Sequence, residues 1–405
     1  GDDNVAIGYQ ALLLNTTADD NTAVGNAALK VNTTGTQNNA FGSGALDANT
    51  TASFNTAMGH NSLGANTTGA GNTALGQTAL TANTTGAQNV GIGAGAGGAV
   101  TTAVNSTFVG YVSGGATTTG ATNTGLGWSA FASNTTGAEN VAVGGQALAA
   151  NTTASNNTAI GRSALVANTT GATNTAVGKS AMAANTTAAN NTAIGYNTLL
   201  VNTTGANNVA LGGSALGSNT SASNNTAIGI SAMVANTTGA SNVAVGFGAL
   251  DANTTASRNT AVGANAASTN TTGTRNSAVG YDALFANTEG NYNTAMGDIA
   301  LRENTTASYN TAVGMGALEK ATTGGFNVAV GTLALDALTT GVDNVAIGHD
   351  CLTLNVAGDN VVAIGAEAAQ QLNPSGNVDM NGVYIGVQAG DEVTTGPHNT
   401  VVGAL

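Results

Sequence analysis

Apolar and polar residues recur along this chain with a period of 17, and one residue type never changes within the period. Glycine returns every 17 residues from Gly8 to Gly365, and again at Gly386 and Gly403. A large apolar residue stands just before each glycine, alanine usually stands two residues before it, and leucine usually stands four after it. A short fixed period over a whole chain predicts a solenoid built from one repeated coil.

Each repeat predicts short strands and turns. The phrase Asn-Thr-Ala-Val-Gly, as in 174–178, carries β-branched residues and predicts a strand, and the x-Ala-Met segment at 180–182 predicts a second one. The Asn-Thr-Thr phrase at 185–187 predicts a turn, and the recurring glycines and threonines disfavour helix. We therefore predict an all-β fold, a single elongated parallel β-solenoid of about 24 coils of 17 residues, with neighbouring coils about 4.8 Å apart.

The period also predicts the domain organisation. Residues 1–365 form the regular solenoid, in which residues 94–120 lose the turn asparagine but keep the period and so predict an irregular, continuous patch. Residues 366–405 continue the solenoid with a four-residue insertion at 370–376, where Pro374 predicts a loop outside the stack. Neither end of the sequence resembles a polar cap, so we expect an uncapped end after the last coil.

Stacking turns each position of the repeat into a ladder along the solenoid. The invariant glycine predicts either a left-handed backbone angle or a contact too close for any Cβ. Asparagine stands four residues before the glycine in all but three repeats, which predicts side-chain amides bonded from coil to coil. In three central repeats these structural ladders consist of Gly161, Gly178, Gly195, Asn157, Asn174 and Asn191.

Two irregular repeats indicate which residues face inward. In the repeat of Gly110 the usual alanine is Phe108 and the usual leucine is Gly114, whereas the next repeat has Gly125 and Phe131. Volume lost at one position and regained at the other predicts that both face one core, with the invariant glycine on the same side. Alternation along the strand then points the residue before the glycine outward. The opposite orientation, with that residue inward and the alanine outward, also fits two repeats.

An outward row of large apolar residues would form an exposed stripe larger than a soluble monomer tolerates. We therefore predict an assembly ridge that is buried against other chains. Its central members are Ile160, Val177, Ile194, Leu211 and Ile228. Two forms of self-association stay open: a homotrimer of chains side by side, and an end-to-end filament in which exposed strand edges pair.

Composition narrows the partners. Only 7% of the residues are charged, the net charge is -13, and the seven basic residues are scattered, so we expect no nucleic-acid partner. No apolar stretch is long enough for a membrane-spanning helix, so we expect no membrane insertion in this segment. Cys351 occupies the position that is alanine in the preceding repeats, which predicts a small core residue.

Candidate chemistry is sparse. Gly-x-Gly strings such as 91–95 imitate nucleotide-binding loops, but no strand–helix unit follows them. His60, His349 and His398 lie far apart in the stack, and the turns lack the aspartates of a calcium-binding repeat. We therefore predict no catalytic, cofactor-binding or metal site, and no enzyme.

Two binding interpretations stay open. An unbroken row of threonines, one every 17 residues, runs from Thr16 to Thr339. Threonine ladders on a flat solenoid are typical of ice-binding proteins. The neighbouring row, which begins at Thr17, must however point to the other side of the strand. The Asn-Thr-Thr phrase is also an N-glycosylation sequon, for example at Asn15 and Asn185. The competing interpretation of the sequon is a turn with an asparagine ladder.

The repeated phrase Asn-Thr-Ala-Val-Gly-x-x-Ala-Leu resembles the head repeats of trimeric autotransporter adhesins, which carry a Ser-Val-Ala-Ile-Gly-x-x-Ala core. It also resembles the Asn-Thr-Ala-Val-Gly-rich repeats of phage tail fibres and bacterial surface proteins. The similarity covers residues 4–403, although the period of 17 is longer than the usual adhesin coil. The adhesin resemblance implies a left-handed parallel β-roll, three chains side by side, and adhesion to surfaces or host matrix.

These expectations combine into one functional prediction. We predict a non-catalytic structural and adhesive repeat protein of an extracellular fibre, on a cell-surface appendage or a virion, with a surface, matrix or glycan target. An ice-binding β-solenoid and a viral tail-fibre shaft are the alternatives.

Overall fold

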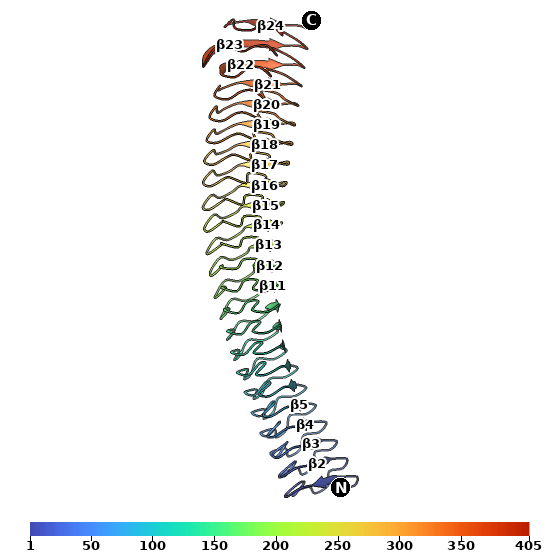
Figure 1. Ribbon diagram of the computed structural model, residues 1–405. Helices are drawn as coiled ribbons and strands as arrows, with labels where there is room; N and C mark the ends of the chain where they lie inside the picture. The colour runs from blue at the N-terminus through green and yellow to red at the C-terminus, as the bar shows by residue number, and fades with distance from the viewer. Residues whose placement is uncertain (405) are drawn as a thin grey trace. The chain divides into compact units, whose positions relative to one another are not determined.

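The computed structural model describes residues 1–404, and Leu405, the last residue of the predicted continuation over 366–405, lies outside the described residues. Contacts divide the chain into two compact units, Gly1–Thr204 and a second that begins at Gly205. Within each unit the coils lie one above the next, and each coil places its strand over the strand of the coil before it (Figure 1). Residues 1–404 contain only strands and turns, so the prediction of an all-β parallel β-solenoid with 17-residue coils is confirmed.

In the first unit every coil contributes one strand of three residues, and neighbouring strands are parallel and in register. Thr158 lies opposite Thr175, Ala159 opposite Ala176, and Ile160 opposite Val177. The strands are β1 (Val5–Ile7), β2 (Thr22–Val24), β3 (Asn39–Phe41), β4 (Thr56–Met58), β5 (Thr73–Leu75), β6 (Val90–Ile92), β7 (Thr107–Val109), β8 (Thr124–Leu126), β9 (Val141–Val143), β10 (Thr158–Ile160), β11 (Thr175–Val177) and β12 (Thr192–Ile194).

The second unit repeats this arrangement and lengthens two of its last strands. Its strands are β13 (Val209–Leu211), β14 (Thr226–Ile228), β15 (Val243–Val245), β16 (Thr260–Val262), β17 (Ser277–Val279), β18 (Thr294–Met296), β19 (Thr311–Val313), β20 (Val328–Val330), β21 (Val345–Ile347), β22 (Gly358–Ile364), β23 (Val378–Ile385) and β24 (Thr400–Val402). The register between β22 and β23 shifts between Asp359 and Val361. The inserted residues are absorbed partly by this bulge.

The predicted loop at the insertion is right in part. Residues 375–379 are exposed, as a loop outside the stack would be. Pro374 itself is buried, and its ring lies beside Gly358 of the preceding coil. The proline therefore packs onto the solenoid, and after it only residues 375–377 lie outside the strands, because β23 begins at Val378 and pairs with β22.

The core consists of small and medium apolar residues from two segments of each coil. In the coil of Gly178, Ala176 of β11 and Ala181 and Met182 beyond the glycine are fully buried. Val177, which follows the buried Ala176, is only partly buried, and equivalent strands show the same alternation. The predicted orientation is confirmed: alanine and leucine positions face the core, and the residue before the glycine faces out.

The compensating exchange of volume is also confirmed. A Cβ on Gly114 would lie 2.2 Å from the Phe108 ring, because that ring occupies the space of the usual leucine. The same exchange occurs near the end of the second unit, where a Cβ on Gly390 would lie 2.4 Å from the buried ring of Tyr384. Core packing tolerates such swaps when the total volume is kept.

The prediction of a second strand after the glycine is wrong. Residues 179–184 form a tight turn in which Ser180 and Met182 have left-handed backbone angles, with φ of 58° and 51°. The backbone still bonds between coils, since the Met182 N–H donates to the Thr198 carbonyl at 2.9 Å. Ala181 and Met182 are consecutive and both buried, which a strand's alternation forbids and this turn permits.

The invariant glycine does not face the core, contrary to the prediction that it lies on the same side as the alanine. Gly178 is partly exposed and has φ of +134°, and a Cβ there would lie 2.4 Å from the Gly195 carbonyl oxygen of the next coil. Both predicted reasons for the glycine therefore apply together. The missing side chain would point along the stack into the neighbouring backbone.

Buried asparagines form two ladders in each unit. At the predicted ladder, the Asn174 backbone N–H donates to Asn157 Oδ1 at 2.9 Å, and Asn174 Nδ2 donates to the Ala188 carbonyl at 2.9 Å. At the turn, Asn185 Nδ2 donates to Asn168 Oδ1 at 2.8 Å and to the Ala188 carbonyl at 3.1 Å. The asparagine ladder is confirmed, and it supplies hydrogen-bond partners where the chain leaves regular strand pairing.

Candidate functional site

The predicted assembly ridge lies on the outer face of the parallel sheet in each unit. In the first unit Ile160 is 40% exposed, Ile194 is 38% exposed, and Val177 between them is partly exposed. In the second unit Leu211 is 43% exposed and Ile228 is 36% exposed. Each strand thus holds its ridge residue in solvent because the alanine before it takes the core side.

A second row runs beside the ridge on the same face. Thr158, Thr175 and Thr192 stand two residues before their ridge residues and are also partly exposed. Parallel in-register pairing places each of these rows in a straight line within its unit. The outer face therefore has one row of large apolar side chains, and beside it a row in which threonine alternates irregularly with valine, for example at Val141 and Val209.

The residue after each glycine varies along the chain and is exposed. Tyr111 is 60% exposed and Trp128 is 55% exposed in adjacent coils of the first unit. Farther along the same unit, Lys179 Nζ lies 5.5 Å from the ring centre of Tyr196. This variable row flanks the sheet face, and its aromatic and basic side chains are of the type that is enriched at binding surfaces.

A run of large side chains in the second unit was not predicted from the sequence. It occupies the position twelve residues after the glycine, which is asparagine, serine or threonine in every coil from Asn156 to Ser241. Its members, called here the arginine–aromatic ladder, are Arg258, Arg275, Tyr292, Tyr309 and Phe326. The rings of Tyr292 and Tyr309 stack with centroids 5.0 Å apart, and those of Tyr309 and Phe326 with centroids 4.9 Å apart.

The signal for this ladder is present in the sequence but only at intervals of 17. Read along the chain, Arg258 and Arg275 are two isolated basic residues, and Tyr292 is one aromatic residue in a polar phrase. Read down the same position of successive coils, they are neighbours. Basic residues that are scattered along a solenoid sequence can therefore be neighbours on the surface of the folded protein.

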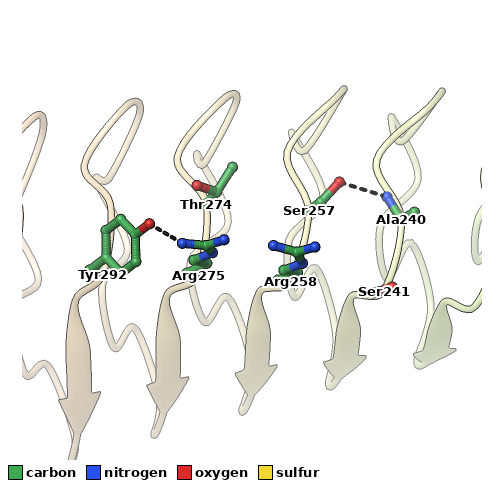
Figure 2. Close-up of a pocket in the computed structure, with 7 residues that line it drawn as sticks. All are labelled: Ala240, Ser241, Ser257, Arg258, Thr274, Arg275 and Tyr292. Atoms are coloured by element: carbon green, nitrogen blue, oxygen red, sulfur yellow. Dashed lines mark hydrogen bonds between the residues drawn. The ribbon is translucent and has the colours of Figure 1, made fainter.

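A groove opens at the arginine end of the ladder. It has a volume of about 410 Å³ and is lined by Ala240, Ser241, Ser257, Arg258, Thr274, Arg275 and Tyr292. Figure 2 shows the two guanidinium groups side by side on neighbouring coils, with Tyr292 next to Arg275. An Arg275 Nη1–H donates to the Tyr292 hydroxyl, and the Arg275 guanidinium carbon lies 5.0 Å from the ring centre. The aromatic ring thus orients one of the two cations.

The turn around the groove is held by hydrogen bonds between coils. The Ala240 backbone N–H donates to Ser257 Oγ at 3.0 Å (Figure 2). In the next coils Thr274 N–H and Thr274 Oγ1–H both donate to Asn291 Oδ1, at 2.8 and 3.0 Å. These bonds fix the backbone from which the arginines project.

Titratable groups with shifted pKa values do not gather in a site. Burial raises the pKa of the Cys351 thiol to about 12, and its Sγ–H donates to the Ala363 carbonyl at 3.3 Å. Loss of hydration also raises the pKa of the carboxyls of Asp47, Asp251 and Asp336, which lie on separate coils. Within residues 1–404 no three His, Cys, Asp or Glu side chains lie close enough to hold a metal ion, and no helix is long and apolar enough to span a membrane.

The Asn-Thr-Thr sequons after the first coil place their acceptor nitrogen inside the protein, whereas Asn15 is partly exposed. Asn185 is fully buried, and its Nδ2 already donates two hydrogen bonds, to Asn168 and Ala188. Asn32 and Asn49 are buried in the same way. Attachment of a glycan at these nitrogens would require local unfolding, so the structure favours the asparagine-ladder interpretation of the turn.

The threonine row from Thr16 to Thr339 is also committed to the fold. Thr152 is partly exposed, and its hydroxyl donates to the Thr169 carbonyl at 3.1 Å, while Thr169 donates in turn to the Thr186 carbonyl at 3.0 Å. The next residue of the turn, such as Thr153, is exposed. The two turn rows thus face in different directions, as predicted.

Comparison with known proteins adds no family to this description. No protein-family model matches the chain, and no curated protein matches it.

Proposed function

We propose that this chain is a structural and adhesive segment of an extracellular fibre, on a cell-surface appendage or a virus tail fibre, and that it performs no catalysis. The observation that carries the proposal is the outer sheet face, where a row of large apolar residues runs along each unit beside a mixed row of threonine and valine. Such a continuous apolar stripe is typical of a surface that another chain covers. Multiple equivalent coils also suit multivalent attachment to a repetitive surface, matrix or glycan target.

Mechanical strength follows from the bonding between coils. In the coil of Gly178, backbone bonds run to both neighbours, for example from Gly178 N–H to Ile160 O at 2.7 Å and from Thr175 N–H to Asn191 O at 2.9 Å. The buried asparagine ladders add side-chain bonds in the same direction. Pulling a coil away from its neighbour would break all of these bonds together, which suits a load-bearing role.

Self-association through the ridge is the central test. In the test variant, Ile160, Val177 and Ile194 are replaced by threonine, which keeps the β-branched shape and removes exposed hydrocarbon. In the control, the exposed turn residues Thr153, Thr170 and Thr187 become alanine. We expect the purified full chain and the control to associate in analytical ultracentrifugation, and the ridge variant to dissociate at the same concentration.

Electron microscopy of the same samples distinguishes the two modes of assembly. A rod of three parallel chains would support the side-by-side homotrimer, and an axial string of single rods would support the end-to-end filament. A wild-type chain that stays a dispersed monomer at all concentrations would refute self-association. Equal association of the ridge variant and wild type would refute the role of the ridge.

Ice binding is a second candidate because part of the outer sheet face has threonines beside branched apolar residues. Thr158, Thr175 and Thr192 are aligned on consecutive coils beside Ile160, Val177 and Ile194. The turn row from Thr16 to Thr339 is less suitable, since its hydroxyls donate to backbone carbonyls. Thermal hysteresis or ice-crystal shaping by the purified chain would favour this function over adhesion, and its absence at high concentration would refute it.

A further inference from the structure

The geometry points to the groove at Arg258 and Arg275 as a binding site for the carboxylate or sulfate groups of an acidic polysaccharide. This inference deepens the adhesive part of the proposed function, because it names a class of target for one surface. It does not depend on self-association through the ridge, since the groove is lined by residues that precede the strands and includes no ridge residue.

The first argument is backbone conformation. Arg258 and Arg275 have left-handed backbone angles, with φ of 63° and 60°, and both are exposed. At the same position other coils place asparagine, such as Asn224, which tolerates this conformation well. Exposed residues at the same position of other coils, such as Thr173, have the same left-handed angle, so it is a property of the repeat. The turn therefore presents Arg258 and Arg275 in the same way on successive coils (Figure 2).

The second argument is electrostatic. Among residues 1–404, neither Arg258 nor Arg275 makes an ion pair, whereas Arg302 lies 3.6 Å from Asp282. Adjacent coils are about 4.8 Å apart, so the two guanidinium groups repel each other. An oxyanion placed between them would accept hydrogen bonds from both and remove that repulsion. The unpaired cations are also unusual because the chain as a whole carries a net charge of -13.

The third argument concerns the kind of anion. The surrounding negative charge disfavours a dense polyanion such as a nucleic acid, so the ligand should carry few, widely spaced charges. The groove lining includes the hydroxyls of Ser241 and Ser257, and the Tyr292 phenol flanks the cations, whereas the Thr274 hydroxyl donates to Asn291. A volume of about 410 Å³ falls within the range of small-ligand sites. Sugar hydroxyls beside a carboxylate or sulfate match this combination of donors, acceptors and positive charge.

The stacked rings define one limit of the site. Tyr309 is sandwiched between Tyr292 and Phe326, with interplanar angles of 6° and 7°, so its faces are covered. One face of Tyr292 meets Arg275 and the other meets Tyr309. Stacking of a sugar ring on these faces is therefore blocked, and affinity must come from the arginines. Removal of the arginines is for this reason the decisive perturbation.

The experiment compares two double variants with equal change in charge. The test variant is Arg258→Gln with Arg275→Gln, and the control is Lys30→Gln with Lys320→Gln, which lie outside both the groove and the row that follows the glycine. Calorimetric titration of the full chain would use four probes: a galacturonate oligomer, a sulfated galactan oligomer, an uncharged galactan oligomer and inorganic sulfate. We expect wild type and control to bind at least one charged oligomer, and the test variant to lose about tenfold or more in affinity.

Each result has a defined meaning. Binding of the galacturonate or the sulfated oligomer alone would support the site and identify its anion. Equal binding of the uncharged oligomer, or equal affinity of the test variant and wild type, would overturn it. Binding of inorganic sulfate with no gain for either oligomer would also overturn it, because the site would then recognise only a small ion.

Sedimentation of the test variant separates this inference from the proposed function. If the test variant associates as the wild type does but no longer binds the saccharide, the loss of binding arises in the groove and self-association is unaffected. An Arg258→Lys, Arg275→Lys variant keeps the charge but loses the planar fork that bridges an oxyanion, so it should bind with intermediate affinity. If the Lys variant and the Gln variant were both as tight as wild type, the groove would have no part in binding.

Discussion

Replacement of Asn157 by alanine should open the solenoid locally. Asn157 is 1% exposed, and its Oδ1 accepts the backbone N–H of Asn174 at 2.9 Å and the side-chain Nδ2 of Asn174 at 3.2 Å. Its own Nδ2 donates to the Gly171 carbonyl at 3.0 Å, which also accepts a bond from Asn168 at 2.9 Å. The substitution therefore leaves the buried Asn174 N–H without this acceptor, while Gly171 keeps a partner.

The magnitude follows from these contacts. A buried N–H that loses its acceptor costs about 1–3 kcal/mol, and each of the two further lost hydrogen bonds costs about 1 kcal/mol, so we expect about 3–5 kcal/mol of local destabilisation. This corresponds to a fall in protection from hydrogen exchange of roughly a hundred-fold to several thousand-fold at the Asn174 amide. Hydrogen exchange followed by mass spectrometry suits the question, because a solenoid opens coil by coil and a single melting curve would average the effect.

The chain supplies its own control for this prediction. Ser106 replaces the ladder asparagine in one coil, and its Oγ accepts the Asn123 backbone N–H at 3.2 Å. Asn157→Ser should therefore lose less than about tenfold in protection, because the key acceptor is kept. Thr153→Ala, in the exposed turn row, should change nothing. The reasoning is refuted if the alanine and serine variants at position 157 lose protection equally, or if the alanine variant loses less than tenfold.

Three further results are expected. Gly144→Ala should destabilise the chain by more than about 2 kcal/mol in thermal unfolding, because its Cβ would lie 2.7 Å from the Gly161 carbonyl and φ is +127°. Gly145→Ala should be neutral, because no atom would lie nearer than 4.0 Å to its Cβ. Equal effects of the two substitutions would contradict the close-contact explanation. Burial raises the pKa of the Cys351 thiol to about 12, so at pH 8 it should react with a maleimide only after denaturation; rapid labelling of native protein would show that the thiol is accessible. Loss of hydration raises the pKa of the Asp251 carboxyl above 3.8, so the folded state holds this proton more tightly than the unfolded state. The contribution of Asp251 to folding stability therefore falls as the pH rises from 3.8 through the pKa of the folded state. The melting temperature at pH 4 should then be no lower than at pH 7, and a clear drop on acidification would contradict this sign.

Much of the fold is predictable because one coil is repeated and each deviation can be compared with many regular copies. The exchange between Phe108 and Gly114 correctly assigned the inside of the coil, since core volume is conserved. The turn after the glycine was missed because Ala181 and Met182 fit a strand by composition. The left-handed backbone angles of Ser180 and Met182 allow both Ala181 and Met182 to be buried, and the sequence gives no sign of these angles.

The candidate sites were predictable to different degrees. The ridge at Ile160 and Ile194 follows from strand alternation and the position of alanine, both of which are local properties. The arginine–aromatic ladder depends on which residues become neighbours after coiling, and this information lies at a separation of 17. The groove itself could not be predicted, because its shape depends on the turn conformation that holds Arg258 and Arg275 apart from any carboxylate.

The distribution of invariant and variable positions explains how such a chain can carry a binding site without weakening its fold. Glycine, the ladder asparagine and the inward alanine are fixed by contacts with the adjacent coils, so a change there disturbs two neighbours at once. The positions one and twelve residues after the glycine point into solvent and vary freely. Substitutions in a few consecutive coils at those positions, as in the arginine–aromatic ladder, build a continuous surface while the ladders beneath them stay intact. In this architecture new specificity therefore requires only exposed residues spaced 17 apart, and the core imposes no further condition.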